Sequence, residues 1–178
     1  MRKCLITVDY QVDFVNGSLG FDGAEKLENV IAEKIEKYRA EGADIIYTLD
    51  THHCDYLTTF EGRILPIEHC IEYTKGHELY GKIKSMDQPN DKVFKKSTYG
   101  SEALFDYQRK CDYKEIELCG LVSNICVISN AVLARTALPN ARLTVDSNAT
   151  ASNDDGLNTK MAPPFREAKF DIVWGTGI

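Results

Sequence analysis

Residues 115–126 read EIELCGLVSNIC, and this stretch decides the fold class. Residues 115–119 predict a strand that Gly120 closes, and the rather apolar stretch over residues 123–137 predicts a helix. A strand that turns directly into a helix is the repeating unit of a parallel sheet. Cys126 then lies in the first turn of the predicted helix.

The rest of the chain repeats this alternation of short strands and helices. Strands are predicted at residues 4–8, 44–49, 92–96, 141–145 and 170–174, and helices at residues 24–41, 101–110 and 154–169. The pattern predicts an α/β fold, a doubly wound (Rossmann-like) parallel sheet with helices on both faces. Ligands of such sheets bind at the carboxyl ends of the strands, where Asp9, Asp50 and Gly120 fall. The irregular stretch at residues 51–91 is long enough to predict a functional loop region.

Length and charge exclude several classes of protein. The 178 residues, 43% of them hydrophobic, predict one domain over residues 1–178. The net charge of −6 argues against a basic face for nucleic acid, and no apolar run reaches the roughly 18 residues of a membrane span. The first residues lack the features of a signal peptide, so we expect a cytoplasmic protein.

Six cysteines occur without a CxxC pair, and a chain of this size and composition does not need disulfides. Most of them, such as Cys4 and Cys119, are expected to be small buried apolar residues. Cys126 differs in its position, because free N–H groups and the helix dipole favour a thiolate there. The residues alone leave two interpretations open, a nucleophile or a structural cysteine.

Three segments together resemble one enzyme family. Residues 119–127 (CGLVSNICV) resemble the CGxxTDxCV signature of the isochorismatase-like cysteine hydrolases, which include the nicotinamidases. Residues 8–14 (VDYQVDF) resemble the family's opening VDxQxDF, and residues 93–101 (VFKKSTYGS) resemble its central lysine segment. The motifs occur in the family's order and span nearly the whole chain.

The resemblance implies a catalytic triad of Asp9, Lys96 and Cys126. Lys95 is adjacent to Lys96, but neighbouring side chains of an extended segment face opposite ways, and the alignment of Tyr99 favours Lys96. The implied reaction converts a small carboxamide into an acid and ammonia through a thioester on Cys126. Asp9 accepts and returns the proton, and the Lys96 ammonium stabilises the thiolate.

The family also implies a cis peptide bond between Leu121 and Val122. This bond would turn the Val122 N–H towards the site, beside the Cys126 N–H, so that the two form an oxyanion hole. Ser123 and Asn124 stand where the family usually has Thr and Asp. Both can still form hydrogen bonds, so we expect the turn to be preserved.

Asp50 and His52 end a predicted strand, and His69 follows in the irregular stretch. By spacing alone these are more often ordinary loop residues than metal ligands. The nicotinamidases carry metal ligands at the matching positions, so the resemblance implies a divalent metal ion (zinc, iron or manganese) on Asp50, His52 and His69. Its role would be to bind and orient a ring nitrogen of the substrate. His53 is expected to be a bystander.

The resemblance places Phe14 and Tyr99 beside the substrate. Many nicotinamidases have an aromatic residue, often Trp, just ahead of the last metal histidine, whereas residues 65–67 here contain none. The one tryptophan, Trp174, is expected to be structural. The pocket wall therefore differs from that of typical nicotinamidases.

Three functions remain in competition. The favoured one is a metal-containing cysteine amidase for a nicotinamide-like carboxamide. A ureide or carbamoyl amide hydrolase of the same superfamily is the second, and its members generally lack the metal ligands. The third is a non-catalytic metal-binding α/β module with an inert Cys126. Isochorismatase proper lacks the nucleophilic cysteine, so Cys126 argues against that activity.

The expected partner is a small-molecule amide. Family members are often dimers or tetramers, which allows a homo-oligomer.

Overall fold

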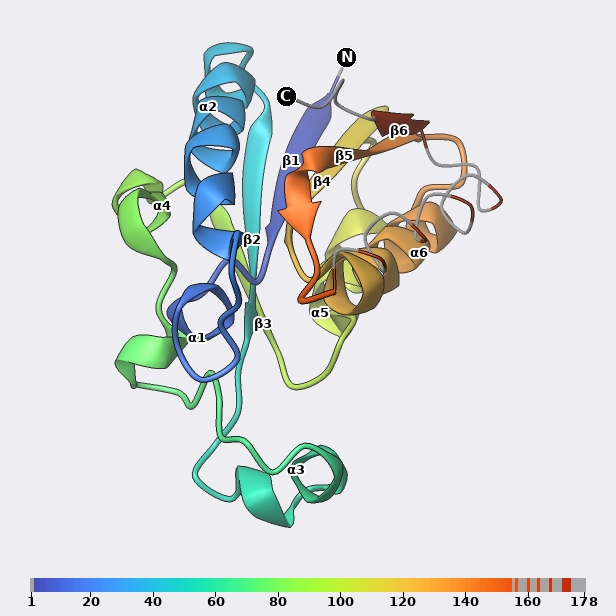
Figure 1. Cartoon of the computed structure of the whole chain (residues 1–178). Coiled ribbons are helices and arrows are strands. Elements are labelled where there is room, and N and C mark those ends of the chain that lie inside the picture. Colours follow the sequence, from blue (N-terminus) through green and yellow to red (C-terminus); the bar gives the residue numbers. More distant parts are fainter. Residues whose placement is uncertain are drawn as a thin grey trace.

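The computed structural model describes residues 2–154, residues 156, 160, 163 and 167, and residues 171–173. Its centre is a six-stranded parallel sheet in the order β3-β2-β1-β4-β5-β6 (Figure 1). The strands are β1 (Lys3–Val8), β2 (Asp44–Asp50), β3 (Lys92–Lys96), β4 (Glu115–Leu121), β5 (Arg142–Ala151) and β6 (Asp171–Val173). The predicted doubly wound parallel sheet is thereby confirmed.

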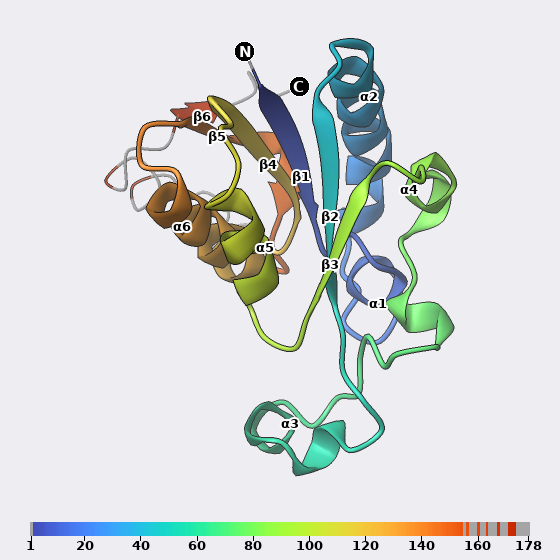
Figure 2. The same ribbon diagram turned by 180° about the vertical axis from the view of Figure 1, so that it is seen from behind.

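Helices cover both faces of this sheet, as the two opposite views show (Figures 1 and 2). Helices α2 (Leu27–Ala40) and α4 (Gly81–Met86) lie on one face, and α5 (Glu102–Gln108) and α6 (Ile128–Ala137) on the other. Each side has its own apolar core, because the central strands β1, β2 and β4 are buried on both faces. Ile31 and Ile35 of α2 belong to one core, and Ala131 and Ala134 of α6 to the other.

Two elements differ from the expectation. Strand β5 continues to Ala151, because its pairing with β4 resumes after a register shift, with Thr150 opposite Gly120. The helix predicted from residue 123 begins as a π-helical turn at Ser123–Val127, and α6 follows it. The helix predicted at residues 154–169 and the role of Trp174 lie mostly or wholly outside the described residues.

The irregular stretch folds into short helical segments. They are a 3-10 turn at Tyr56–Thr58, helix α3 (Phe60–Ile64), a second 3-10 turn at Lys75–His77, and helix α4. The Thr59 side chain caps α3 by accepting a hydrogen bond from the Gly62 N–H at 3.0 Å. Helix α3 stands apart from the sheet, beyond the carboxyl ends of the strands (Figures 1 and 2). None of the helices in the described part of the chain is long and apolar enough to cross a membrane.

The order of the strands reverses between β1 and β4, which are neighbours in the sheet. Ligands of doubly wound sheets bind at this switch point, outside the carboxyl ends of the strands. Gly120 lies there opposite Val8 with a φ of 106°, and a Cβ at that position would overlap the Val8 carbonyl oxygen. Glycine is therefore required where the two strands reach the site.

Candidate active site

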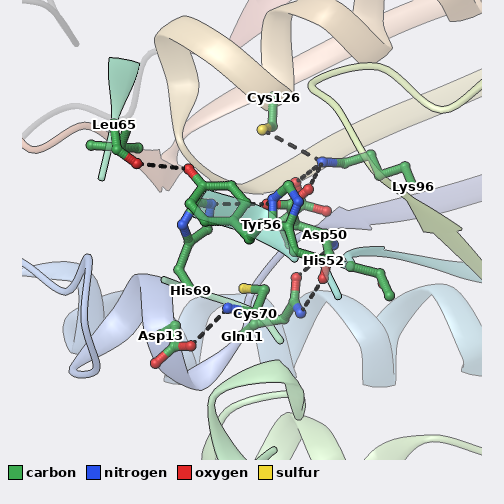
Figure 3. A network of polar contacts seen from close by, with 12 residues as sticks. Gln11, Asp13, Asp50, His52, Tyr56, Leu65, His69, Cys70, Lys96 and Cys126 are labelled. Atoms are coloured by element: carbon green, nitrogen blue, oxygen red, sulfur yellow. Dashed lines mark hydrogen bonds and ion pairs between the residues drawn. The ribbon is translucent and has the colours of Figure 1, made fainter. Parts of the chain in front are cut away.

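Four adjacent strands deliver four functional side chains to one edge of the sheet. Lys96 ends β3, Asp50 ends β2, Asp9 follows β1, and Cys126 lies in the turn after β4. All four residues are buried. Figure 3 shows the Lys96 ammonium between the Cys126 sulfur and the Asp50 carboxylate. Residues far apart in the sequence thus converge because parallel strands end at the same edge.

Lys96 contacts both other members of the predicted triad. Its Nζ lies 2.7 Å from Asp9 Oδ2 and 3.6 Å from Cys126 Sγ. The Thr48 hydroxyl donates a hydrogen bond of 2.7 Å to the other oxygen of Asp9. Lys95 points away from the site and is exposed, with its Nζ 2.6 Å from Glu72. The structure therefore places Lys96, and not its neighbour, beside the thiol.

Burial governs the protonation of this group. It raises the pKa of Asp9, and the Lys96 ammonium opposes that rise. It also raises the pKa of the Cys126 thiol well above its ordinary value, with a further contribution from the Asp9 charge, while Lys96 lowers it. Burial alone lowers the pKa of Lys96, but the charges of Asp9, Cys126 and Asp50 outweigh it and raise that pKa. The free site consequently holds a protonated thiol beside an ammonium and a carboxylate that can accept its proton.

The turn that carries Cys126 contains the cis peptide bond that the family resemblance implies. The Leu121–Val122 peptide bond is cis. The Val127 N–H donates to the Val122 carbonyl at 3.1 Å, which closes the wide π turn around Cys126. The Asn130 side chain donates to the carbonyl oxygens of Cys126 at 2.8 Å and Tyr99 at 3.0 Å. Asn130 therefore ties the cysteine turn to the segment that follows Lys96.

Asp50, His52 and His69 form a buried cluster beside the triad. Their ligand atoms lie within 4.8 Å of one another, with His52 Nε2 at 3.1 Å and His69 Nε2 at 3.5 Å from Asp50 Oδ2. His69 Nδ1 lies 2.8 Å from the Ile67 carbonyl, a contact that directs Nε2 into the cluster. One carboxylate and two imidazoles suit zinc, iron or manganese, so these residues fit the implied ion. His53 is exposed near Glu72, outside the cluster.

Aromatic rings enclose the two histidines. Tyr56 is fully buried, and its ring centroid lies 4.6 Å from that of His52 and 5.0 Å from that of His69. The Phe14 ring lies 5.6 Å from the His69 ring on the pocket side. Sequence reasoning did not identify Tyr56, because nothing local shows that the stretch after His52 folds back over it.

Two side chains of the opening motif, Gln11 and Asp13, position the candidate metal ligands. The Gln11 amide donates to the carbonyls of Asp50 at 2.9 Å and His77 at 2.8 Å, and it accepts the Asp50 N–H at 2.8 Å. Asp13 accepts the N–H of Cys70, the residue after His69, at 2.7 Å. The motif itself was the signal for both residues, but the role of each depends on partners distant in the sequence.

A cavity of about 480 Å³ opens onto the cysteine. Its walls include the predicted residues Phe14, Tyr99, Val122 and Cys126, together with Asp50 and His69. Further lining residues come from the α3 segment and from neighbouring loops: Phe60, Glu61, Ile64, Leu65, Leu19, Phe21, Thr98, Ile125 and Asn153. The nucleophile candidate and the metal cluster therefore face one common pocket of a size that suits a small molecule.

Comparison with known protein families agrees with this arrangement. The model of the isochorismatase domain matches residues 3–163. The chain belongs to the isochorismatase family. A comparison with curated proteins found no match.

Solved structures similar to this isochorismatase-family hydrolase include amidases. Nicotinamidase PncA from Bacillus subtilis is 26% identical, with a TM-score of 0.84 over 98% of this chain and 100% of the other. Pyrazinamidase of Pyrococcus horikoshii, solved in complex with zinc, is 23% identical, with a TM-score of 0.84 over 97% and 99%. N-carbamoylsarcosine amidase from Thermoplasma acidophilum is 24% identical, with a TM-score of 0.81 over 100% and 99%. The last two likenesses establish a shared fold.

Proposed function

We propose that this protein is a cysteine amidohydrolase that cleaves a small, nicotinamide-like carboxamide to the acid and ammonia. The observation that supports this most directly is the contact of Lys96 with both Asp9 and Cys126 at the base of the pocket. A thiol, a proton acceptor and a cation in one buried group are what nucleophilic attack on a carbonyl requires.

The reaction begins with transfer of the thiol proton from Cys126 to the Asp9 carboxylate as the sulfur attacks the amide carbon. A C–S bond forms, and the carbonyl oxygen becomes an oxyanion that the N–H groups of Val122 and Cys126 stabilise. Lys96 stabilises the negative charge that develops on sulfur as the proton leaves. Attack coupled to proton transfer fits the raised pKa of the thiol, because no free thiolate has to accumulate.

The intermediate collapses when Asp9 returns the proton to the leaving nitrogen, so that the C–N bond breaks and ammonia departs. A thioester on Cys126 remains. Asp9, again a carboxylate, takes a proton from water, and the hydroxide attacks the thioester carbon. The C–S bond then breaks, the sulfur takes the proton back, and the acid is released. Asp9 thus serves as base and acid in both halves of the reaction.

Asp50, His52 and His69 would hold a divalent metal ion in the same pocket. When bound, the ion would supply a Lewis-acid anchor for a ring nitrogen of the substrate. Phe14 packs near His69 and would contact the face of a planar ring, and Tyr99 would close the opposite part of the pocket. This cluster favours a nicotinamide-like substrate. The second candidate substrate is a ureide or carbamoyl amide, and the likeness to N-carbamoylsarcosine amidase supports it.

A panel of amides tests the proposal. Ammonia release from nicotinamide, pyrazinamide and a carbamoyl amide is measured for the wild type, Cys126→Ala and the control Cys54→Ala, which changes an exposed cysteine. We expect hydrolysis of the ring amides by the wild type and the control, and its loss in Cys126→Ala. Activity that survives in Cys126→Ala would contradict the mechanism, and activity confined to the carbamoyl amide would favour the second candidate.

A further inference from the structure

Glu61 is an acidic residue in the wall of the substrate pocket. It lies in the first turn of α3, between the apolar side chains of Phe60, Ile64 and Leu65 that line the same cavity. It is half-buried, and its carboxylate makes no hydrogen bond or ion pair with any residue that the structure describes. An anion without a partner on an apolar wall is a group that a ligand can satisfy.

Glu61 and Tyr99 line the same pocket from different segments of the chain. Glu61 comes from α3, and Tyr99 comes from the segment that follows Lys96. The Glu61 charge contributes, after burial, to a raised pKa of Tyr99. The carboxylate is therefore one of the groups that border the space open to a ligand.

No cation of the described residues balances this charge within the pocket. The lining contains two carboxylates, Asp50 and Glu61, and no lysine or arginine among the described residues. Asp50 is paired with Lys96, His52 and His69. Lys96 is buried against Asp9 below the pocket. Glu61 is thus the carboxylate that remains for the substrate.

We propose that Glu61 is a specificity-determining residue that selects amides with a cationic or hydrogen-bond-donating substituent away from the scissile carboxamide and rejects amides with a carboxylate there. This inference rests on the proposed amidohydrolase function. A donor on the substrate would pair with Glu61 as the pocket loses its water, whereas a second anion would be repelled in the same low-dielectric space.

Three matched substrates test the proposal. They are nicotinamides that carry an aminomethyl, an ethyl or a carboxylate group meta to the carboxamide, so that the ring nitrogen and the reacting group stay the same. The values of kcat/KM are compared for the wild type, Glu61→Gln and the control Asp55→Asn. Asp55 is an exposed acid on the same loop that does not line the pocket.

We expect the wild type to prefer the cationic substrate and to disfavour the anionic one. Glu61→Gln should lower the ratio of cationic to anionic kcat/KM by about tenfold, with each value taken relative to that of the neutral substrate for the same variant. Asp55→Asn should leave the ratio unchanged. A ratio that Glu61→Gln does not move, or that both variants move equally, would overturn the assignment.

Binding separates this inference from the proposed reaction. Calorimetry with the three compounds is repeated in the Cys126→Ala background, with and without Glu61→Gln. If the wild type hydrolyses none of the three compounds but its charge preference in binding depends on Glu61, the proposed amidohydrolase function is contradicted and the specificity role of Glu61 is supported. Hydrolysis with a ratio insensitive to Glu61 keeps the reaction and overturns the role of Glu61, as does the absence of binding by all three compounds.

Discussion

The Lys96 ammonium lies 3.2 Å from Oδ1 of Asp50, while the other oxygen of Asp50 faces His52 and His69. One carboxylate is therefore shared between the candidate metal cluster and the cation that contacts Cys126. Because the negative charge of Asp50 contributes to the raised pKa of the Cys126 thiol, neutralising that charge is expected to change the reactivity of the sulfur.

A divalent metal ion on Asp50 should accelerate alkylation of Cys126. The ion compensates the Asp50 charge and so lowers the pKa of the thiol, which increases the thiolate fraction at a given pH. The rate of carbamidomethylation is followed peptide by peptide by mass spectrometry, before and after chelation. Cys54 is exposed and serves as the internal control, with an unchanged rate. Equal rates for Cys126 with and without metal would show that the two sites are not coupled.

Asp9→Asn should make Cys126 more reactive and the enzyme less active. Burial is the largest cause of the raised pKa of the thiol, and the Asp9 charge is the second. When the Asp9 charge is removed, Lys96 remains to stabilise the thiolate. Alkylation of Cys126 at pH 8 is expected to become faster than in the wild type, while kcat falls by at least about 100-fold because the general base is lost. Slower alkylation together with lost activity would instead indicate a collapsed site, which circular dichroism would reveal.

The acid limb of the pH profile should lie above the ordinary range of an aspartate. Burial raises the pKa of Asp9, and the reaction needs its ionised form. Activity is therefore expected to fall as the pH decreases through this raised pKa, at a higher pH than the value of about 3.9 for a solvated aspartate. The measurement is kcat/KM against pH for a substrate that does not titrate in this range. An acid limb at or below the solvated value would contradict the assignment of Asp9 as the base.

Asp13→Ala should weaken metal binding without touching a ligand. The Asp13 carboxylate holds the Cys70 N–H, and the backbone φ of Cys70 is 46°, a conformation that residues with a side chain rarely adopt. Loss of this hydrogen bond frees His69 to move, so we expect about a tenfold loss of zinc affinity in a competition titration. Asp22→Ala, at an exposed position, is the matched control. An unchanged affinity in Asp13→Ala would show that His69 is held by other contacts.

Gln11→Leu should destabilise the fold by about 3 kcal/mol, because the buried polar groups of Asp50 and His77 lose their partners. The three hydrogen bonds of this side chain join β2 to the second 3-10 turn. Urea denaturation measures the change in the free energy of unfolding. Gln88→Leu, on an exposed loop, provides the comparison and should change it by less than about 0.5 kcal/mol. A similar effect of both substitutions would indicate that Gln11 has no special structural role.

The sequence predicted the parts of the molecule in which local pattern and final contacts agree. Strand β3 has the predicted bounds, although most of its residues are exposed. Strands β1 and β2 differ from the prediction by one residue each, and their apolar runs are buried in the sheet. The motifs identified Asp9, Lys96 and Cys126 as candidates, although the cysteine alone was more consistent with a core position than with catalysis. Predicting the sheet order was not needed for this, since parallel strands bring their carboxyl ends together.

Other features of the structure depend on contacts between residues that are distant in the sequence. The extension of β5 follows from its pairing with β4 beyond a register shift, where the Thr150 hydroxyl donates to the Gly120 carbonyl. The short helix α3 has too few residues to be stable by propensity, so periodicity does not reveal it. The contact of Tyr56 with the two histidines and the place of Glu61 in the pocket could therefore be found only from the folded structure.

The position of α3 outside the sheet has an evolutionary consequence. The side chains that we assign to bond cleavage are buried at or just beyond the carboxyl ends of the strands, where a substitution disturbs the core. Phe60, Glu61 and Ile64 instead lie on the small helix α3. Mutations in this helix can alter which molecules are accepted at little cost to folding. Homologues that descend from such a protein can therefore differ in substrate range while they keep the same catalytic residues.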